Sequence, residues 1–119
     1  LEVRKHAGMM MPLPVQKASI AAWLDDAHVA EQWERYAARR SVLREALMAA
    51  GFRIDLSHAG LYLWATRDEP CWDTVHWLAE RGILVAPGDF YGSAGARHVR
   101  VALTATDEAV QLAYDRLTG

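Results

Sequence analysis

The amino-acid sequence predicts an α/β (α+β) domain, with a small, mainly antiparallel sheet of three or four strands and helices packed on one face. Residues 52–57 (FRIDLS) and 61–66 (LYLWAT) alternate apolar and polar side chains across a short turn, as in a hairpin. Residues 98–104 (HVRVALT) alternate in the same way and lead directly into a helical pattern. The predicted order of elements is α-α-β-β-α-β-β-α.

Two helices are expected before the first strand. Residues 8–14 (GMMMPLP) break any continuous helix, and Pro14 suits the first turn of a helix that runs on to residue 24. Asp25 or Asp26 can cap a longer helix that ends at Gly51. The apolar side chains of this longer helix recur every three or four residues and are expected to face the core: Val29, Trp33, Tyr36, Leu43 and Leu47.

The hairpin is expected to bury its alternating apolar side chains, which are Phe52, Ile54, Leu56, Leu61, Leu63 and Ala65. A helix follows, with Pro70 in its first turn and Gly82 as its stop. Its inward side chains are expected to be Val75, Leu78 and Ala79.

Residues 83–86 (ILVA) predict a short apolar strand, and residues 87–97 predict a loop. In this loop Gly88 and Gly92 are expected to adopt backbone conformations that other residues disfavour. The last helix is expected to begin at Thr106, and its apolar side is formed by Val110, Ala113, Tyr114 and Leu117.

Composition excludes several classes of protein. The 119 residues are 52% hydrophobic and carry a formal net charge of -2, which describes one domain with a substantial core rather than a basic nucleic-acid binder. No apolar run is long enough to cross a membrane. A single cysteine, Cys71, excludes an internal disulfide and fits a reducing cytoplasm. The first residues (LEVRKHAG) lack a methionine, so we expect a piece of a longer chain.

Most candidate chemistries find little support. The five histidines do not pair with one another or with Cys71 at the spacing of metal ligands, so no metal site is expected. Cys71, Ser57 and Ser93 lack the sequence context of a nucleophile. A reaction that requires a lysine nucleophile has only two candidate residues in this chain, Lys5 and Lys17.

The sequence also predicts the surroundings of three tryptophans and one arginine. Trp33 and Trp77 are expected in the core, whereas Trp64 faces solvent or a partner surface. Arg100 stands in a strand between two valines. It is either a solvent-facing side chain on a half-buried strand or a group that projects into a cleft. In a cleft its planar fork could bind a carboxylate through two parallel hydrogen bonds.

Three stretches in this order, GLYLWA at 60–65, ILVAPGDFYG at 83–92 and HVRVALT at 98–104, resemble the C-terminal small domain of the class I and II aminotransferases. These are fold-type I enzymes that depend on pyridoxal 5'-phosphate, and the resemblance covers essentially the whole chain. It implies that residues 1–14 end a large domain and connect it to a small domain at 15–119. Details such as RKHAGMM and RVALTATDE look most like the N-succinyldiaminopimelate aminotransferase branch.

The resemblance also implies a site. Arg100 matches the arginine that holds the α-carboxylate of the substrate, and Tyr62 falls where the family often has an aromatic side chain near the substrate. Phe90 and Tyr91 would shape the entrance. The implied reaction is a ping-pong transfer of an amino group between amino acids and 2-oxo acids by a cytoplasmic homodimer. The branch implies N-succinyldiaminopimelate and glutamate as amino donors, in lysine biosynthesis, with neither nucleic acid nor membrane as a partner.

The chain departs from a complete enzyme of this kind. The family's cofactor-binding lysine lies in an S-x-x-K segment, and neither Lys5 nor Lys17 has such surroundings. We therefore expect no catalytic or cofactor-binding residue here, and a chain that alone is inactive. Alternatives are another class I/II aminotransferase, a carbon–sulfur lyase on the same scaffold, or a stand-alone α/β module that binds amino acids or regulates another protein.

Overall fold

The computed structural model describes residues 1–119, which divide into two compact units, Leu1–Trp33 and Glu34–Gly119. The first unit holds α1 (Glu2–His6), α2 (Leu13–Trp23) and the first turns of α3 (Ala27–Ala49). None of its side chains is buried. As expected, Pro14 lies in the first turn of α2, and Asp25 Oδ1 accepts the Ala27 amide at 3.1 Å to cap α3.

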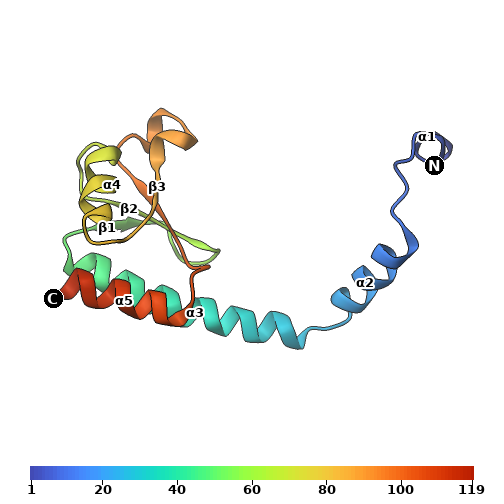
Figure 1. Ribbon diagram of the computed structural model, residues 1–119, viewed down its shortest axis with the longest axis horizontal. Coiled ribbons are helices and arrows are strands. Elements are labelled where there is room, and N and C mark those ends of the chain that lie inside the picture. Colours follow the sequence, from blue (N-terminus) through green and yellow to red (C-terminus); the bar gives the residue numbers. More distant parts are fainter. The chain divides into compact units, whose positions relative to one another are not determined.

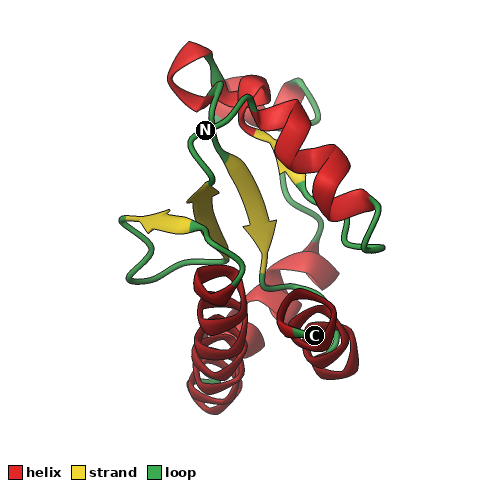
Figure 2. Ribbon diagram, turned by 90° about the vertical axis from the view of Figure 1, so that its left-hand side faces the viewer, coloured by secondary structure: helices red, strands yellow, loops and turns green.

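The second unit is built on one antiparallel sheet (Figure 2). Its strands are β1 (Arg53–Asp55), β2 (Tyr62–Thr66), β3 (Ala86–Pro87) and β4 (Val99–Ala102), in the order β1-β2-β4-β3. The predicted hairpin is confirmed, since Ile54 pairs with Ala65 in antiparallel register. The shortest strand, β3, forms one edge, so β4 has a hydrogen-bonded neighbour on both sides.

One face of the sheet packs against helices α3, α4 (Cys71–Ala79) and α5 (Asp107–Thr118). The core joins inward residues of the two central strands to all three helices: Leu43, Leu47, Leu63, Ala65, Val75, Leu78, Val99, Val101 and Val110. These were the inward positions that the alternation and helical spacing predicted. The structure thus confirms an α/β fold with a mainly antiparallel sheet. None of its helices has the length and apolar character that a membrane crossing requires.

Polar contacts fasten α5 along the later part of α3 (Figure 1). Arg39 of α3 donates from Nε to Asp107 at 2.5 Å and from Nη1 to the Leu103 carbonyl at 3.1 Å. Thr106 caps α5, as predicted, by accepting the Ala109 amide at 3.3 Å. The end of β4 and the start of α5 are therefore both tied to α3.

Several apolar residues expected to be inward are exposed. Trp33 and Val29 lie in the part of α3 that precedes its first buried residue, Leu43, so the core position predicted for Trp33 is wrong. Leu56 is 93% exposed because its positive φ of 48° ends β1 and breaks the alternation. Leu61, Ala79 and Leu84 are exposed as well. Of the predicted strand at 83–86 only Ala86 lies in β3, and Pro87 of the predicted loop is its second residue, which leaves Leu84 outside the sheet and 91% exposed.

Trp77, by contrast, packs against the core as predicted. Its indole lies 6.0 Å from the Phe52 ring, measured between centroids. The guanidinium carbons of Arg67 and Arg81 lie 4.2 Å and 3.6 Å from the ring centroid. These cation–π contacts place two charged side chains over the ring of a partly buried tryptophan.

The loop before β4 folds into two short 3₁₀ helices, η1 (Gly88–Tyr91) and η2 (Ser93–Gly95). Its backbone is fastened to β4, since Gly88 donates to the His98 carbonyl at 2.8 Å and His98 donates to Gly95 at 2.9 Å. A Cβ atom on Gly88 would lie 2.0 Å from the Gly95 oxygen. Gly88 is therefore required for close backbone approach and not, as expected, for an unusual φ. Gly92 does have the positive φ predicted for it, 104°.

We predict that Gly88→Ala lowers the free energy of unfolding by about 2–3 kcal/mol, because the added methyl meets rigid backbone. Gly51→Ala is the matched control: its φ is +84° but no atom lies within 4 Å of the added Cβ. The control should cost only about 1 kcal/mol of backbone strain. Urea denaturation of both variants measures the difference, and equal losses would contradict the close contact.

Candidate functional site

The face of the sheet that points away from the core carries the candidate site. In β4 the buried residues Val99 and Val101 flank Arg100, which is half-buried on the opposite face. Antiparallel register places Trp64 of β2 directly opposite Arg100. Residues two apart on a strand share a face, so Tyr62 lies on this face too. The structure therefore brings together the two site residues predicted from the sequence.

Two tyrosine rings lie close to the Arg100 guanidinium. Its central carbon lies 4.2 Å from the Tyr62 ring centroid and 5.2 Å from that of Tyr91 in η1. The Nε atom is buried and has no hydrogen-bond partner, and no group of the chain forms a hydrogen bond or ion pair with this guanidinium. A buried donor without a partner costs about 1–3 kcal/mol. The side chain is thus a fixed, unneutralised cation, which suits an anionic ligand.

Trp64 links this cation to a second polar cluster. Its indole meets the Tyr91 ring edge-on, with centroids 5.8 Å apart and an interplanar angle of 81°. On another side it stacks flat on His98, at 5.2 Å and 6°. His98 Nε2 lies 3.0 Å from Asp55 Oδ2 in β1.

Two basic groups stabilise the Asp55 carboxylate. The hydrogen bond with His98 is the larger cause that lowers the pKa of Asp55 below its ordinary 3.8, and the contact with Arg53 adds to it. Arg53 Nη1 lies 2.5 Å and 2.7 Å from the two carboxylate oxygens. Partial burial acts in the opposite direction and is outweighed.

The side chains of Phe90 and Tyr91 contact different residues, although both were expected to shape the entrance of the substrate site. Tyr91 faces Arg100, whereas Phe90 is exposed and meets Trp72 of α4 edge-on at 6.0 Å. The Trp72 indole nitrogen donates to Asp89 at 3.1 Å, which ties η1 to α4. Of the two rings, therefore, only that of Tyr91 contacts Arg100, and that of Phe90 packs against α4.

Groups for covalent or metal chemistry are not assembled in this chain. Lys5 and Lys17 are both exposed, whereas a lysine that forms an imine with a cofactor must be shielded and unprotonated. They do not fit a pyridoxal phosphate site. Cys71 is free and buried, and its amide donates to the Ala96 carbonyl at 2.8 Å. No three His, Cys, Asp or Glu side chains lie close enough together to bind a metal ion.

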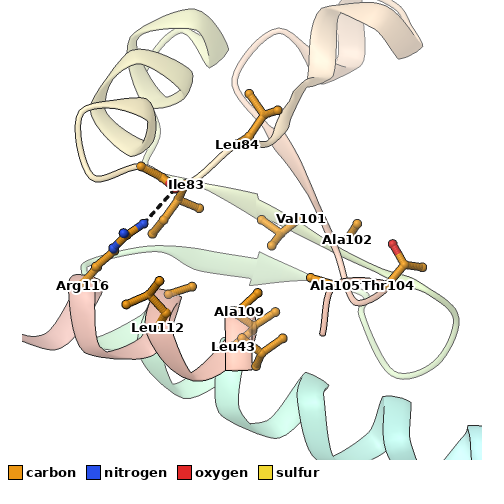
Figure 3. A pocket seen from close by; sticks show the side chains of 13 residues that line it. Leu43, Ile83, Leu84, Val101, Ala102, Thr104, Ala105, Ala109, Leu112 and Arg116 are labelled. Atoms are coloured by element: carbon orange, nitrogen blue, oxygen red, sulfur yellow. Dashed lines mark hydrogen bonds between the residues drawn. The ribbon is translucent and has the colours of Figure 1, made fainter. Parts of the chain in front are cut away.

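A groove of about 390 Å³ lies between residues 82–84, the end of β4 and α5 (Figure 3). Its walls are mainly apolar, with Ile83, Leu84 and Leu112 among them. The single charged group of its lining, Arg116, donates to the Gly82 carbonyl at 3.0 Å. Arg100 is not part of this lining, so the groove and the unpaired cation are separate features.

No sequence motif singled out Asp55 and His98 as residues near the site. Both occupy polar positions of predicted strands, so their shared face could have been inferred. Their contact, however, depends on the order of three strands, which no local pattern specifies.

Comparison with known proteins places the chain in context. Residues 3–117 match the family described as aminotransferase class I and II. The probable aminotransferase Rv1178 of Mycobacterium tuberculosis is 69% identical over 99% of this chain and 28% of its own length. The 4-dedimethylamino-4-oxo-anhydrotetracycline transaminase OxyQ of Streptomyces rimosus is 62% identical, over 99% of this chain and 33% of its own.

Two proteins with lower sequence identity to this chain are aminotransferases as well. The LL-diaminopimelate aminotransferase of Halothermothrix orenii is 34% identical over 76% of this chain and 24% of its own length. The solved structure of an aminotransferase from Staphylococcus aureus has a TM-score of 0.82 at 28% identity, over 98% of this chain and 32% of that one. The chain thus spans about a third or less of the proteins it matches.

We predict that the stability contributed by Asp55 depends on pH. Because its pKa is lowered in the folded state, the contribution is present above the ordinary pKa of 3.8 and is lost as the pH falls through the lower folded-state value. Asp55→Asn should therefore reduce the free energy of unfolding at neutral pH. Urea denaturation across a pH series should show the gap from the unmodified protein closing in acid. A gap that stays constant at the lowest pH would contradict this assignment.

Proposed function

The chain belongs to the class I and II aminotransferase family, and on that premise we propose that Arg100 binds the α-carboxylate of the amino-acid and 2-oxo-acid substrates. The observation that carries the proposal is the half-buried guanidinium, which has no hydrogen-bond or ion-pair partner in the chain and lies close to two tyrosine rings. Every amino acid and 2-oxo acid carries the carboxylate that such a cation recognises. Alanine, glutamate and longer substrates could therefore share one anchor.

The rings of Tyr62 and Tyr91 restrict the guanidinium without neutralising it. Cation–π contact stabilises the charge, while a carboxylate can still accept two parallel hydrogen bonds from the planar fork. Holding the carboxylate fixes the direction of the substrate's Cα–H bond. Orientation of this kind can contribute several kcal/mol to rate enhancement, with about 7–11 kcal/mol as a general upper range.

We propose that residues 1–119 form the C-terminal, substrate-binding part of a longer chain, with 1–14 as the end of a large domain and its connection, and 15–119 as a small domain. The chain spans only 28% and 33% of the length of two of its relatives, which supports a longer protein. Pyridoxal 5'-phosphate would be held by residues outside these 119, because neither lysine here fits the cofactor. What this part supplies is recognition and orientation of the substrate.

For the substrates we propose N-succinyldiaminopimelate and glutamate as amino donors with 2-oxo acids as acceptors, in lysine biosynthesis. The relative that acts on LL-diaminopimelate, at 34% identity, supports an amino donor of this length. A second candidate follows from the relative at 62% identity, whose substrate is an oxo-anhydrotetracycline. In that case the acceptor would be a polycyclic ketone, and Arg100 would anchor the amino donor.

We also propose that the full-length protein is a homodimer in the cytoplasm. Large exposed apolar side chains are concentrated in the first unit and offer a surface for a partner subunit: Met9, Met10, Met11, Leu13, Ile20, Trp23 and Leu24. The one cysteine of the chain is free, as is usual in a reducing compartment.

We predict that Arg100→Lys in the full-length enzyme lowers kcat/KM for N-succinyldiaminopimelate and glutamate by roughly 10–100-fold, because lysine keeps the charge but loses the paired hydrogen bonds. Steady-state kinetics with 2-oxoglutarate as acceptor would measure the loss. Arg97→Lys, an exposed arginine three residues away, is the control and should behave as the unmodified enzyme. Full activity of the Arg100 variant would refute the carboxylate role. Activity with glutamate and a polycyclic ketone, but none with N-succinyldiaminopimelate, would favour the second candidate.

A further inference from the structure

We propose that Trp64 is a positioning residue for Arg100, and that the hydrogen bond between His98 and Asp55 keeps the Trp64 indole in place. This inference rests on the function proposed for Arg100. It assigns a role to three side chains, Asp55, His98 and Trp64, whose contacts reach Arg100 through Tyr91.

Trp64 supports the site from two directions. It stands directly opposite Arg100 in the β2–β4 register, and side chains opposite one another across antiparallel strands have Cβ atoms about 4.5–5.5 Å apart. Its edge-on contact at 5.8 Å also supports the ring of Tyr91. Tyr91 is 51% exposed and precedes Gly92, whose φ is 104°, so it has few other restraints. Without the indole, one of the two rings that confine Arg100 would lose its support.

His98 in turn fixes the plane of the indole. The two rings are parallel within 6°, so any rotation of the imidazole would disturb the stack. The backbone of His98 is held on both sides, by the Gly88 amide at 2.8 Å and the Gly95 carbonyl at 2.9 Å. The side chain is fixed by Asp55 at 3.0 Å.

The environment of the imidazole indicates which nitrogen carries the proton. Nδ1 is buried with no hydrogen-bond partner, whereas Nε2 faces the Asp55 carboxylate. A proton on Nδ1 would be a buried donor without an acceptor, so the favoured tautomer has its proton on Nε2 and donates to Asp55. Arg53, which pairs with the same carboxylate, keeps Asp55 charged and oriented. The resulting order of contacts is Asp55, His98, Trp64, Tyr91 and Arg100.

The test uses the full-length enzyme with pyridoxal phosphate and measures kcat and KM for glutamate. Trp64→Leu should raise KM about tenfold and change kcat by less than about threefold, since residues in contact with one another are energetically coupled. Trp64→Phe keeps a ring and should restore most of the loss. Asp55→Ala and His98→Phe should each raise KM about threefold, because the stack remains but its anchor is gone. These two variants also provide the answer if Trp64→Leu fails to fold.

Controls separate positioning from general damage. Trp77→Leu removes a half-buried tryptophan elsewhere in the same unit, and should lower Tm while leaving KM unchanged. In an Arg100→Lys background, Trp64→Leu should raise KM by less than twofold, because the group that it positions has already been altered.

Two outcomes would overturn the positioning role: an unchanged KM in Trp64→Leu and in Asp55→Ala, or full additivity of the Trp64 and Arg100 changes. Failure of the proposed function is distinguished by the Arg100→Lys variant itself, whose KM would then equal that of the unmodified enzyme.

Discussion

Strand β4 is hydrogen-bonded on both sides, and this constraint determines the rest of the second unit. Val99 is fully buried and Val101 nearly so, and each contributes about 1.5–3 kcal/mol when removed from water. A slip of one residue would exchange these valines for Arg100 in the core, at a cost that no neighbouring group offsets. The valines thus orient the arginine. Its cross-strand neighbours on β2 then decide which rings surround it.

Local patterns predicted the elements whose residues alternate or recur with a clear period. The hairpin, β4, α5 and its Thr106 cap all follow from nearest neighbours in the chain. The same patterns failed where pairing ends, because Leu56 and Leu84 continue an apolar alternation after the backbone has left the sheet. The core position predicted for Trp33 was wrong for a related reason. A stripe of apolar residues on a helix does not reveal how far along the helix the packed surface extends.

In the candidate site, too, some features could be predicted from the sequence and others could not. Arg100 and Tyr62 were predicted from a family resemblance carried by short motifs, and the Arg100 guanidinium carbon lies 4.2 Å from the centroid of the Tyr62 ring. The contacts among Trp64, His98 and Asp55 join three strands, and their order in space is a property of the whole sheet. No single segment of sequence encodes those contacts.

The backbone contact between Gly88 and Gly95 also bears on how this site can diversify. The loop between β3 and β4 is closed at both ends by hydrogen bonds to His98, and its two glycines leave no room between their main chains. Insertions and deletions would open that closure and displace β4 along with it. Natural variation in selectivity at this loop should therefore arise through exchange of the side chains it displays, Phe90 and Tyr91, while its length stays constant.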